Sequence, residues 1–224
     1  MMSVPSIENH TAKINPTPVS YDALLDQFRA PEGKKILLHG SDDVFRVALA
    51  LAAHVMAAHE LVAVVDGCNR FNVLSLAKFA RQRKINADDF LTRIYVSRGF
   101  TCYQMEAAIT ERLPAFLARH NARFAMVLGL LDTMYDTQAS ARDVTGIVEQ
   151  INAALTQLSR GPVTVLNALV SWPVEDPARR RLFAMVQRAA DAVYHVSSGA
   201  DGRPRVLLER AGPQERLAAK NATV

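Results

Sequence analysis

Short apolar runs alternate along the chain with longer segments in which apolar residues recur every three or four positions. The short runs are rich in β-branched residues and lack strict polar alternation, which is typical of strands covered on both faces. They span residues 35–39, 61–66, 93–97, 124–131, 162–167 and 192–196. The helical segments are 44–58, 72–84, 103–119, 139–160 and 178–189. This alternation predicts right-handed βαβ units and a mainly parallel sheet, hence an α/β fold.

The two ends of the chain differ from this pattern. The last apolar run is followed by a turn at Ser198–Gly202 and a further strand-like run at 205–209, which together predict an antiparallel hairpin at the edge of the sheet. Residues 1–20 are polar and contain prolines, so we expect a flexible N-terminal arm, and residues 211–224 are expected to form a C-terminal tail. Residues 21–210 would then be the core domain.

Composition limits the function classes only weakly. The chain has 224 residues, 50% of them hydrophobic, and a formal charge of +4. Such a mild basic excess permits a nucleic-acid partner without requiring one. There are two cysteines, no apolar N-terminal segment of the kind that a secretory signal needs, and no long uninterrupted apolar run. We therefore expect a cytoplasmic protein with no membrane partner.

The segment after the first βαβ strand has the strand–turn–helix context of a phosphate-binding loop, G-x-x-x-x-G-K-[ST]. On that template Gly40 is retained, whereas Phe45 replaces the second glycine, Arg46 the lysine and Val47 the hydroxyl residue. Valine cannot coordinate Mg²⁺, and phenylalanine does not adopt glycine's conformations cheaply. The simpler interpretation of the motif alone is an ordinary βα turn in which Ser41, Asp42 or Asp43 caps the helix.

Four further segments change that balance. They are VVDGCNRF at 64–71, NADDFLTRIYVSR at 86–98, MVLGLLD at 126–132 and TVLN at 164–167. Their order and spacing resemble the core of RecA-like recombinases. The resemblance covers residues 21–210 and implies a RecA-like three-layer αβα fold with a mainly parallel central sheet and a C-terminal antiparallel edge hairpin.

The resemblance also implies roles for individual residues. Cys68 stands where the family has the glutamate that activates the attacking water, and a neutral thiol is a poor general base. Asp132 ends the strand that resembles Walker B, whose aspartate orients Mg²⁺. The implied site is a vestigial nucleotide site made of Gly40, Ser41, Arg46 and Asp132, without catalytic residues.

A nucleic-acid interface is a separate possibility. In the family, loops that correspond to residues 134–143 and 168–181 contact DNA. The second holds Trp172, followed by Arg179, Arg180 and Arg181, and an aromatic side chain beside clustered arginines can bind single strands. Alternatively, Trp172 packs into the core and the arginines form a solvated helix face.

No metal site is expected. His39, Cys68 and Cys102 each follow or end a predicted strand, but no closely spaced ligand pair such as C-x-x-C occurs. The function that fits best is a non-hydrolysing RecA-like paralogue that acts as a binding or scaffolding partner in DNA repair or recombination, with DNA or another RecA-like subunit as partner. It could form homo- or hetero-oligomers and would need no cofactor. The alternatives are an ATP-binding protein that uses ATP with Mg²⁺ in an altered loop, and a direct DNA-binding module.

Overall fold

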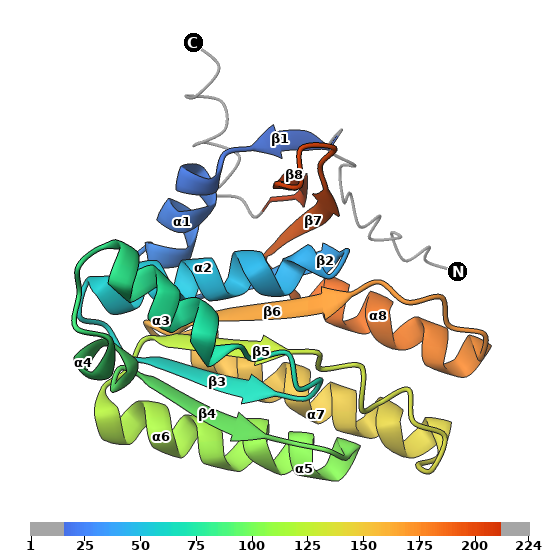
Figure 1. The fold of residues 1–224 in the computed structure, drawn as a ribbon. Coiled ribbons are helices and arrows are strands. Elements are labelled where there is room, and N and C mark those ends of the chain that lie inside the picture. Colours follow the sequence, from blue (N-terminus) through green and yellow to red (C-terminus); the bar gives the residue numbers. More distant parts are fainter. Residues whose placement is uncertain (1–15, 212–224) are drawn as a thin grey trace, which may run out of the picture.

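A computed structural model describes residues 16–211 as an α/β structure built on one eight-stranded sheet (Figure 1). Its strands are β1 (Thr17–Val19), β2 (Lys34–Gly40), β3 (Val62–Asp66), β4 (Ile94–Arg98), β5 (Phe124–Leu128), β6 (Thr164–Val170), β7 (Ala192–Ser198) and β8 (Pro204–Arg210). Their order across the sheet is β1-β8-β7-β2-β6-β5-β3-β4. The strands from β7 to β4 are parallel, and β8 and β1 are antiparallel to their neighbours.

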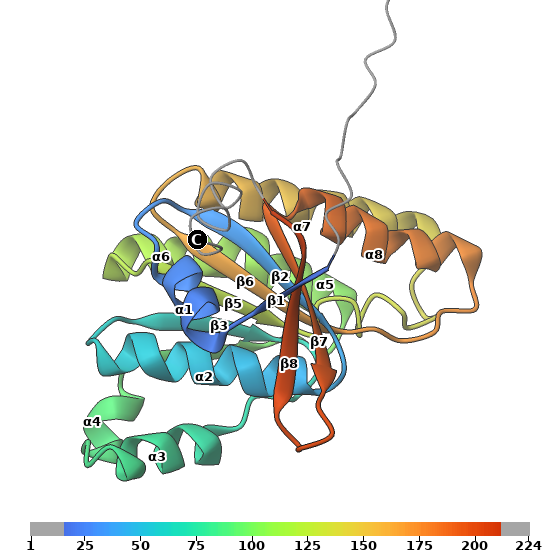
Figure 2. The same cartoon turned by 90° about the horizontal axis from the view of Figure 1, so that it is seen from above.

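Helices cover both faces of the sheet (Figure 1 and Figure 2). One face carries α1 (Tyr21–Arg29), α2 (Asp43–Ala57), α3 (Val73–Gln82) and α4 (Ala87–Leu91). The other carries α5 (Cys102–Ala107), the π-helix η1 (Ala108–Arg112), α6 (Leu113–His120), α7 (Ala141–Ser159) and α8 (Pro177–Ala189). Among the described residues, no helix is both long enough and apolar enough to span a membrane.

Successive side chains of the central strands point to opposite faces of the sheet and so contribute in turn to the two hydrophobic cores. In β2 all seven residues are buried; Ile36 and Leu38 join the core under α1–α4, whereas Leu37 joins the core under α5–α8. A strand with helices on both faces needs apolar residues at every position, as the sequence pattern indicated. The α/β class and the mixed, mainly parallel sheet are thus confirmed.

The N-terminal region differs from the expected arm. Thr17–Val19 form β1, which pairs with β8, so the β7–β8 hairpin does not form the outermost edge of the sheet. Ser20 then caps α1, its Oγ accepting a hydrogen bond from the Ala23 amide. The sequence analysis placed no helix at Tyr21–Arg29, although α1 buries three apolar side chains. The remaining parts of the expected arm and tail, residues 1–15 and 212–224, lie outside the described residues.

Two predicted elements change length. The strand expected at 124–131 ends at Leu128, because Gly129 adopts a φ of 63° and turns the chain. The strand expected at 162–167 continues to Val170, which leaves Asn167 in its middle rather than at its end. Both changes move the boundary between sheet and loop at the carboxyl edge, where a ligand site would lie.

Candidate functional site

The loops that follow β2, β3, β5 and β6 meet at the carboxyl edge of the parallel strands, the usual place for ligands in such sheets. Asp42 after β2 lies 3.6 Å from Arg70 after β3. Arg70 in turn acts electrostatically on Asp132 after β5, and Trp172 after β6 hydrogen-bonds to Asp132. The four loops therefore lie together at this edge of the sheet.

The turn after β2 leaves no room for a wide phosphate-binding loop. Only Ser41 and Asp42 separate β2 from α2. The Val44 and Phe45 amides already donate to the carbonyls of Ser41 and Asp42, which tightens the chain into the first helical turn. Phe45 and Val47 lie within α2 and are buried. In the phosphate-binding motif these two positions close the loop around the phosphates, whereas here both residues lie in a helix and pack into the core.

Gly40 is required by the neighbouring strand. Its φ is 134°, and a Cβ atom added to it would lie 2.1 Å from the carbonyl oxygen of Val196 in β7. The next amide, that of Ser41, donates to the same carbonyl at 2.9 Å. The close approach of β2 and β7 thus explains this glycine without a phosphate group.

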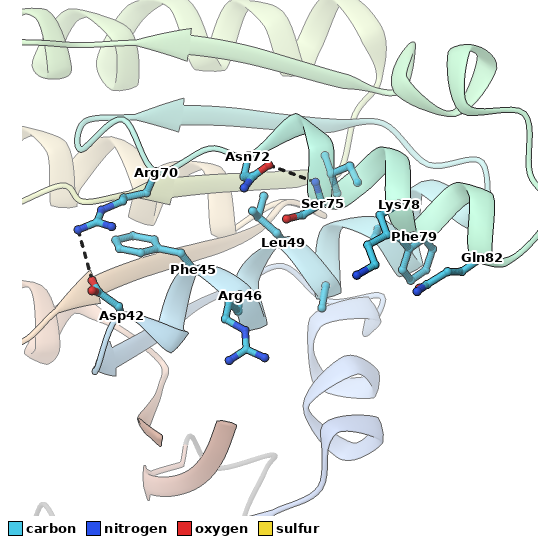
Figure 3. Close-up of a pocket in the computed structure, with 13 residues that line it drawn as sticks. Asp42, Phe45, Arg46, Leu49, Arg70, Asn72, Ser75, Lys78, Phe79 and Gln82 are labelled. Carbon is cyan, nitrogen blue, oxygen red and sulfur yellow. Dashed lines mark hydrogen bonds and ion pairs between the residues drawn. The ribbon is translucent and has the colours of Figure 1, made fainter. Parts of the chain in front are cut away.

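Arg46 belongs to a structural cluster. Its Nη1 donates to Asp43 Oδ1 at 2.6 Å and approaches the Gly202 carbonyl at 3.4 Å. The other Asp43 oxygen accepts a hydrogen bond from Ser198 Oγ at 2.6 Å, so the carboxylate ties α2 to the β7–β8 hairpin. The hydrogen bond from Ser198, together with Arg46, lowers the pKa of Asp43. In Figure 3 the Arg46 guanidinium points away from the Asp42–Arg70 pair.

Asp66, at the end of β3, organises the loop that follows it. Its buried carboxylate accepts hydrogen bonds from the amides of Cys68, Arg70 and Phe71 at 3.1–3.2 Å. Arg98 Nε in β4 lies 3.7 Å from the same carboxylate. With these four donors around it, the Asp66 carboxylate has a structural role: it fixes the conformation of the loop after β3.

Cys68 cannot replace a catalytic carboxylate. Its thiol contacts Asp66 Oδ1 at 3.6 Å, and a Cβ atom added to Gly129 would lie 2.3 Å from the Cys68 Cβ. Burial, together with the charges of Asp66 and Asp132, raises the pKa of the thiol far above its ordinary value. The side chain is a neutral packing group at neutral pH, and it cannot accept a proton from water.

Asp132 is the carboxyl group at this edge whose pKa is raised most clearly above its ordinary value. Burial raises its pKa to about 6, with further increases from Asp42 and Asp66, while Arg70 and the Trp172 hydrogen bond act in the opposite direction. Asp132 therefore faces the loop after β6. Arg46 is held toward the hairpin at the other side of α2, so these two members of the predicted nucleotide site serve different contacts.

The three consecutive arginines do not share a surface. Arg179 is buried and donates to the carbonyls of Met134 and Ala139. Arg180 donates to the carbonyls of the loop that precedes α8, at 3.1 Å. Arg181 reaches Thr145 Oγ1 in α7, also at 3.1 Å. Because each guanidinium has its own protein partner, the arginine cluster expected from the sequence is dispersed.

Trp172 does not pack into the core, since 51% of it is exposed. It lines a cavity of 630 Å³ whose other walls include Asp132, Tyr135, Glu175 and Asp176. Of the described residues, Arg179 is the cation that lines this cavity, beside three carboxyl groups. Because carboxylates repel phosphates, the cavity disfavours the nucleic-acid contact predicted for Trp172, Arg179, Arg180 and Arg181.

A groove between α2 and α3 was not foreseen from the sequence. It has a volume of 480 Å³ and extends from the Asp42–Arg70 pair along both helices (Figure 3). The signal was present in α3, where Ser75, Phe79 and Gln82 follow one another at helical spacing on one face. Sequence alone could not show that this face is open rather than covered.

The other unforeseen surface is the edge strand β4. In the part of the chain that the structure describes, it pairs only with β3. In contrast to the covered strand expected at 93–97, Tyr95 and Val96 are 41% and 39% exposed. Phe100 and Tyr103, which follow the strand, are 71% and 56% exposed. A cavity of 370 Å³ opens beside Tyr95 and Val96 against α6. We call these four residues the β4 edge patch.

No protein-family model and no curated protein matches this sequence. Within residues 16–211, no group of three or more histidine, cysteine, aspartate or glutamate side chains is arranged to hold a metal ion. The class of the protein is given by its structure. It is a mixed-sheet α/β protein with a closed turn after β2 and open surfaces at β4 and between α2 and α3.

Proposed function

We propose that this protein is a non-hydrolysing RecA-like paralogue that serves as a binding or scaffolding partner in DNA repair or recombination. The proposal takes its family and pathway from the sequence resemblance. The structure supports the proposal in two ways: it has an exposed surface through which such a partner could bind, and it lacks the side chains that ATP hydrolysis needs.

The observation that carries the binding role is the β4 edge patch. A parallel edge strand presents unpaired backbone N–H and C=O groups, and an added strand can satisfy them. Edge strands of monomers are usually protected by charges, prolines or covering segments; β4 carries one charge, on Arg98 at its end, while Tyr95 and Val96 in the strand and Phe100 and Tyr103 after it are each exposed. A partner segment that pairs with β4 and places an apolar side chain in the adjoining cavity would bury this patch.

The closed turn supports the absence of ATP hydrolysis. Hydrolysis needs a phosphate cradle, a Mg²⁺ ligand and a general base. At the corresponding positions the protein has the buried helical residues Phe45 and Val47 and the neutral thiol of Cys68. None of these side chains can perform the missing step.

Light scattering coupled to size-exclusion chromatography tests the proposal, with the protein alone and mixed with a purified RecA-like recombinase core. We expect a complex that Val96→Arg abolishes, because a charge would then lie on the strand that has to pair. Leu74→Arg is the matched control, since Leu74 is 75% exposed on α3 and lies outside the β4 edge patch. A complex that forms equally well with both variants, or no complex with the recombinase core, would reject this proposal.

Arg46 gives a specific reason to test nucleotide binding as a second candidate, because 63% of its side chain is exposed and guanidinium pairs well with phosphate. Restoring the motif by Phe45→Gly, Arg46→Lys and Val47→Thr should still give no efficient phosphate release, since Cys68 offers no base. Rapid turnover by the triple variant would show that another group activates water.

A further inference from the structure

The groove between α2 and α3 combines an apolar floor with a cationic rim. The apolar residues Phe45, Leu49 and Leu76 line the floor, and Arg46, Arg70 and Lys78 are the cations around it. Figure 3 shows Phe45, Leu49 and the three cations. The three cations come from three different segments: α2, the loop before α3, and α3 itself. A surface of this composition is complementary to a ligand that is apolar on one side and acidic on the other.

We propose that this groove binds an acidic amphipathic helix of a partner protein. Its apolar side chains would contact the floor, and its carboxylates would pair with the cations on the rim. The inference does not depend on the proposed function, because the groove lies on the α1–α4 face and shares no residue with the β4 edge patch.

The rim is short of negative charge. Among the described residues, Lys78 makes no hydrogen bond or ion pair with the protein. Arg70 is half-exposed, and its ion pair with Asp42 is long, at 3.6 Å. Asp42 is the one acidic side chain that lines the groove. A carboxylate of a bound segment would therefore find unused hydrogen-bonding capacity at Lys78 and Arg70, whereas Arg46 already pairs with Asp43 and adds its positive charge to the rim.

The dimensions favour a helix. The lining residues extend from Asp42, which directly precedes α2, to Ala53 within it, and at 1.5 Å per residue that stretch is about 16 Å long, or three helical turns. Ser75, Phe79 and Gln82 line the opposite wall at one-turn spacing. Two helices that flank a shallow apolar trough form the setting in which amphipathic helices are commonly bound.

Nucleic acid fits this groove less well. Phe45 is nearly buried, and the Phe79 ring is covered by the Arg83 guanidinium at 3.8 Å, so no aromatic face is free to stack on a base. The terminal segments of the chain also match poorly, since residues 212–224 contain Glu215 but two basic residues, Arg216 and Lys220. The charge of the rim therefore favours a separate, acidic partner segment.

A fluorescently labelled peptide of about 12 residues, the length of three helical turns, would serve as the probe in polarisation titrations of the full chain. It would carry leucine at every third or fourth position and glutamate elsewhere, and a second peptide would have lysine in place of glutamate. The protein variants are Lys78→Glu and, as the matched control, Arg81→Glu, which changes an exposed cation of the same helix outside the groove.

We expect Lys78→Glu to weaken binding of the glutamate peptide at least about tenfold and Arg81→Glu to change it less than about twofold, with weaker binding at high salt. The lysine peptide should not bind. The proposal is overturned if neither peptide binds, if both variants lose affinity equally, or if single-stranded DNA displaces the peptide at lower concentration than the unlabelled peptide does. Val96→Arg should leave peptide binding unchanged, which separates this result from the test at the β4 edge patch.

Discussion

Two adjacent aspartates at the start of α2 occupy opposite environments, and the difference gives a sharp test of the structural role of this turn. The Asp43 side chain is 9% exposed and accepts short hydrogen bonds from Ser198 Oγ and Arg46 Nη1, both at 2.6 Å. The Asp42 side chain is 61% exposed, makes no capping hydrogen bond and lies 3.6 Å from Arg70. Replacing each with alanine changes the same charge at neighbouring positions.

The expected magnitudes follow from these contacts. Asp43→Ala removes two short charge-assisted contacts, the hydrogen bond from Ser198 Oγ and the ion pair with Arg46, at a cost of about 2 kcal/mol. The negative charge in the first helical turn adds about 0.5 kcal/mol. Asp42→Ala loses only a long, exposed ion pair and should cost less than about 0.5 kcal/mol.

Urea denaturation followed by circular dichroism measures both free energies of unfolding. Because the pKa of Asp43 is lowered in the folded state, its contribution is complete above the ordinary value of 3.8 and is lost as the pH falls toward the folded pKa. The Asp43→Ala variant should therefore lose less stability on acidification than the wild type. Equal destabilisation by the two alanine variants would refute the assignment of Asp43 as the anchor of this turn.

Three further outcomes are expected in denaturation experiments. Gly40→Ala should cost at least about 3 kcal/mol, because its φ is 134° and its Cβ would meet the Val196 carbonyl; a neutral effect would contradict the close strand approach. The contribution of Asp132 to the free energy of unfolding should fall by about 1 kcal/mol, after discounting for solvent screening, as the pH rises from 3.8 to about 6, so the wild type should lose about that much stability relative to Asp132→Asn over this range. Arg179→Lys should lower the free energy of unfolding by about 2 kcal/mol and Arg181→Lys by less than about 0.5 kcal/mol. The reverse order would contradict the buried, hydrogen-bonded position of Arg179.

Local patterns were sufficient to predict the central strands. Runs such as KILLH at 35–39 have β-branched or aliphatic residues at successive positions, and only a strand with a helix on each face can bury all of them. The β1 strand gives no such signal, because three residues show no periodicity and their pairing partner β8 lies far along the chain. The exposure of β4 also escaped prediction, since the order of strands in the sheet decides which strand lies at an edge.

The site was harder to predict than the fold. The sequence pattern assigned Gly40 to a vestigial nucleotide site, whereas the structure shows a steric requirement for glycine from the backbone of Val196, which sequence spacing does not reveal. Arg179, Arg180 and Arg181 are chemically identical in the sequence, and their different roles arise from the carbonyls and the Thr145 hydroxyl that lie near each helix face. Tertiary contacts of this kind depend on loops that carry no periodic pattern.

The turn after β2 is closed in a way that should prevent nucleotide binding, and calorimetric titration of ATP and ADP with Mg²⁺ tests this most directly. An Arg46→Ala variant is the control, because Arg46 is the exposed cation at the motif's lysine position. We predict no binding to either protein up to about 1 mM nucleotide, a free energy weaker than about −4 kcal/mol. Micromolar binding by the wild type that disappears in Arg46→Ala would contradict the account and would make the protein a nucleotide-regulated one.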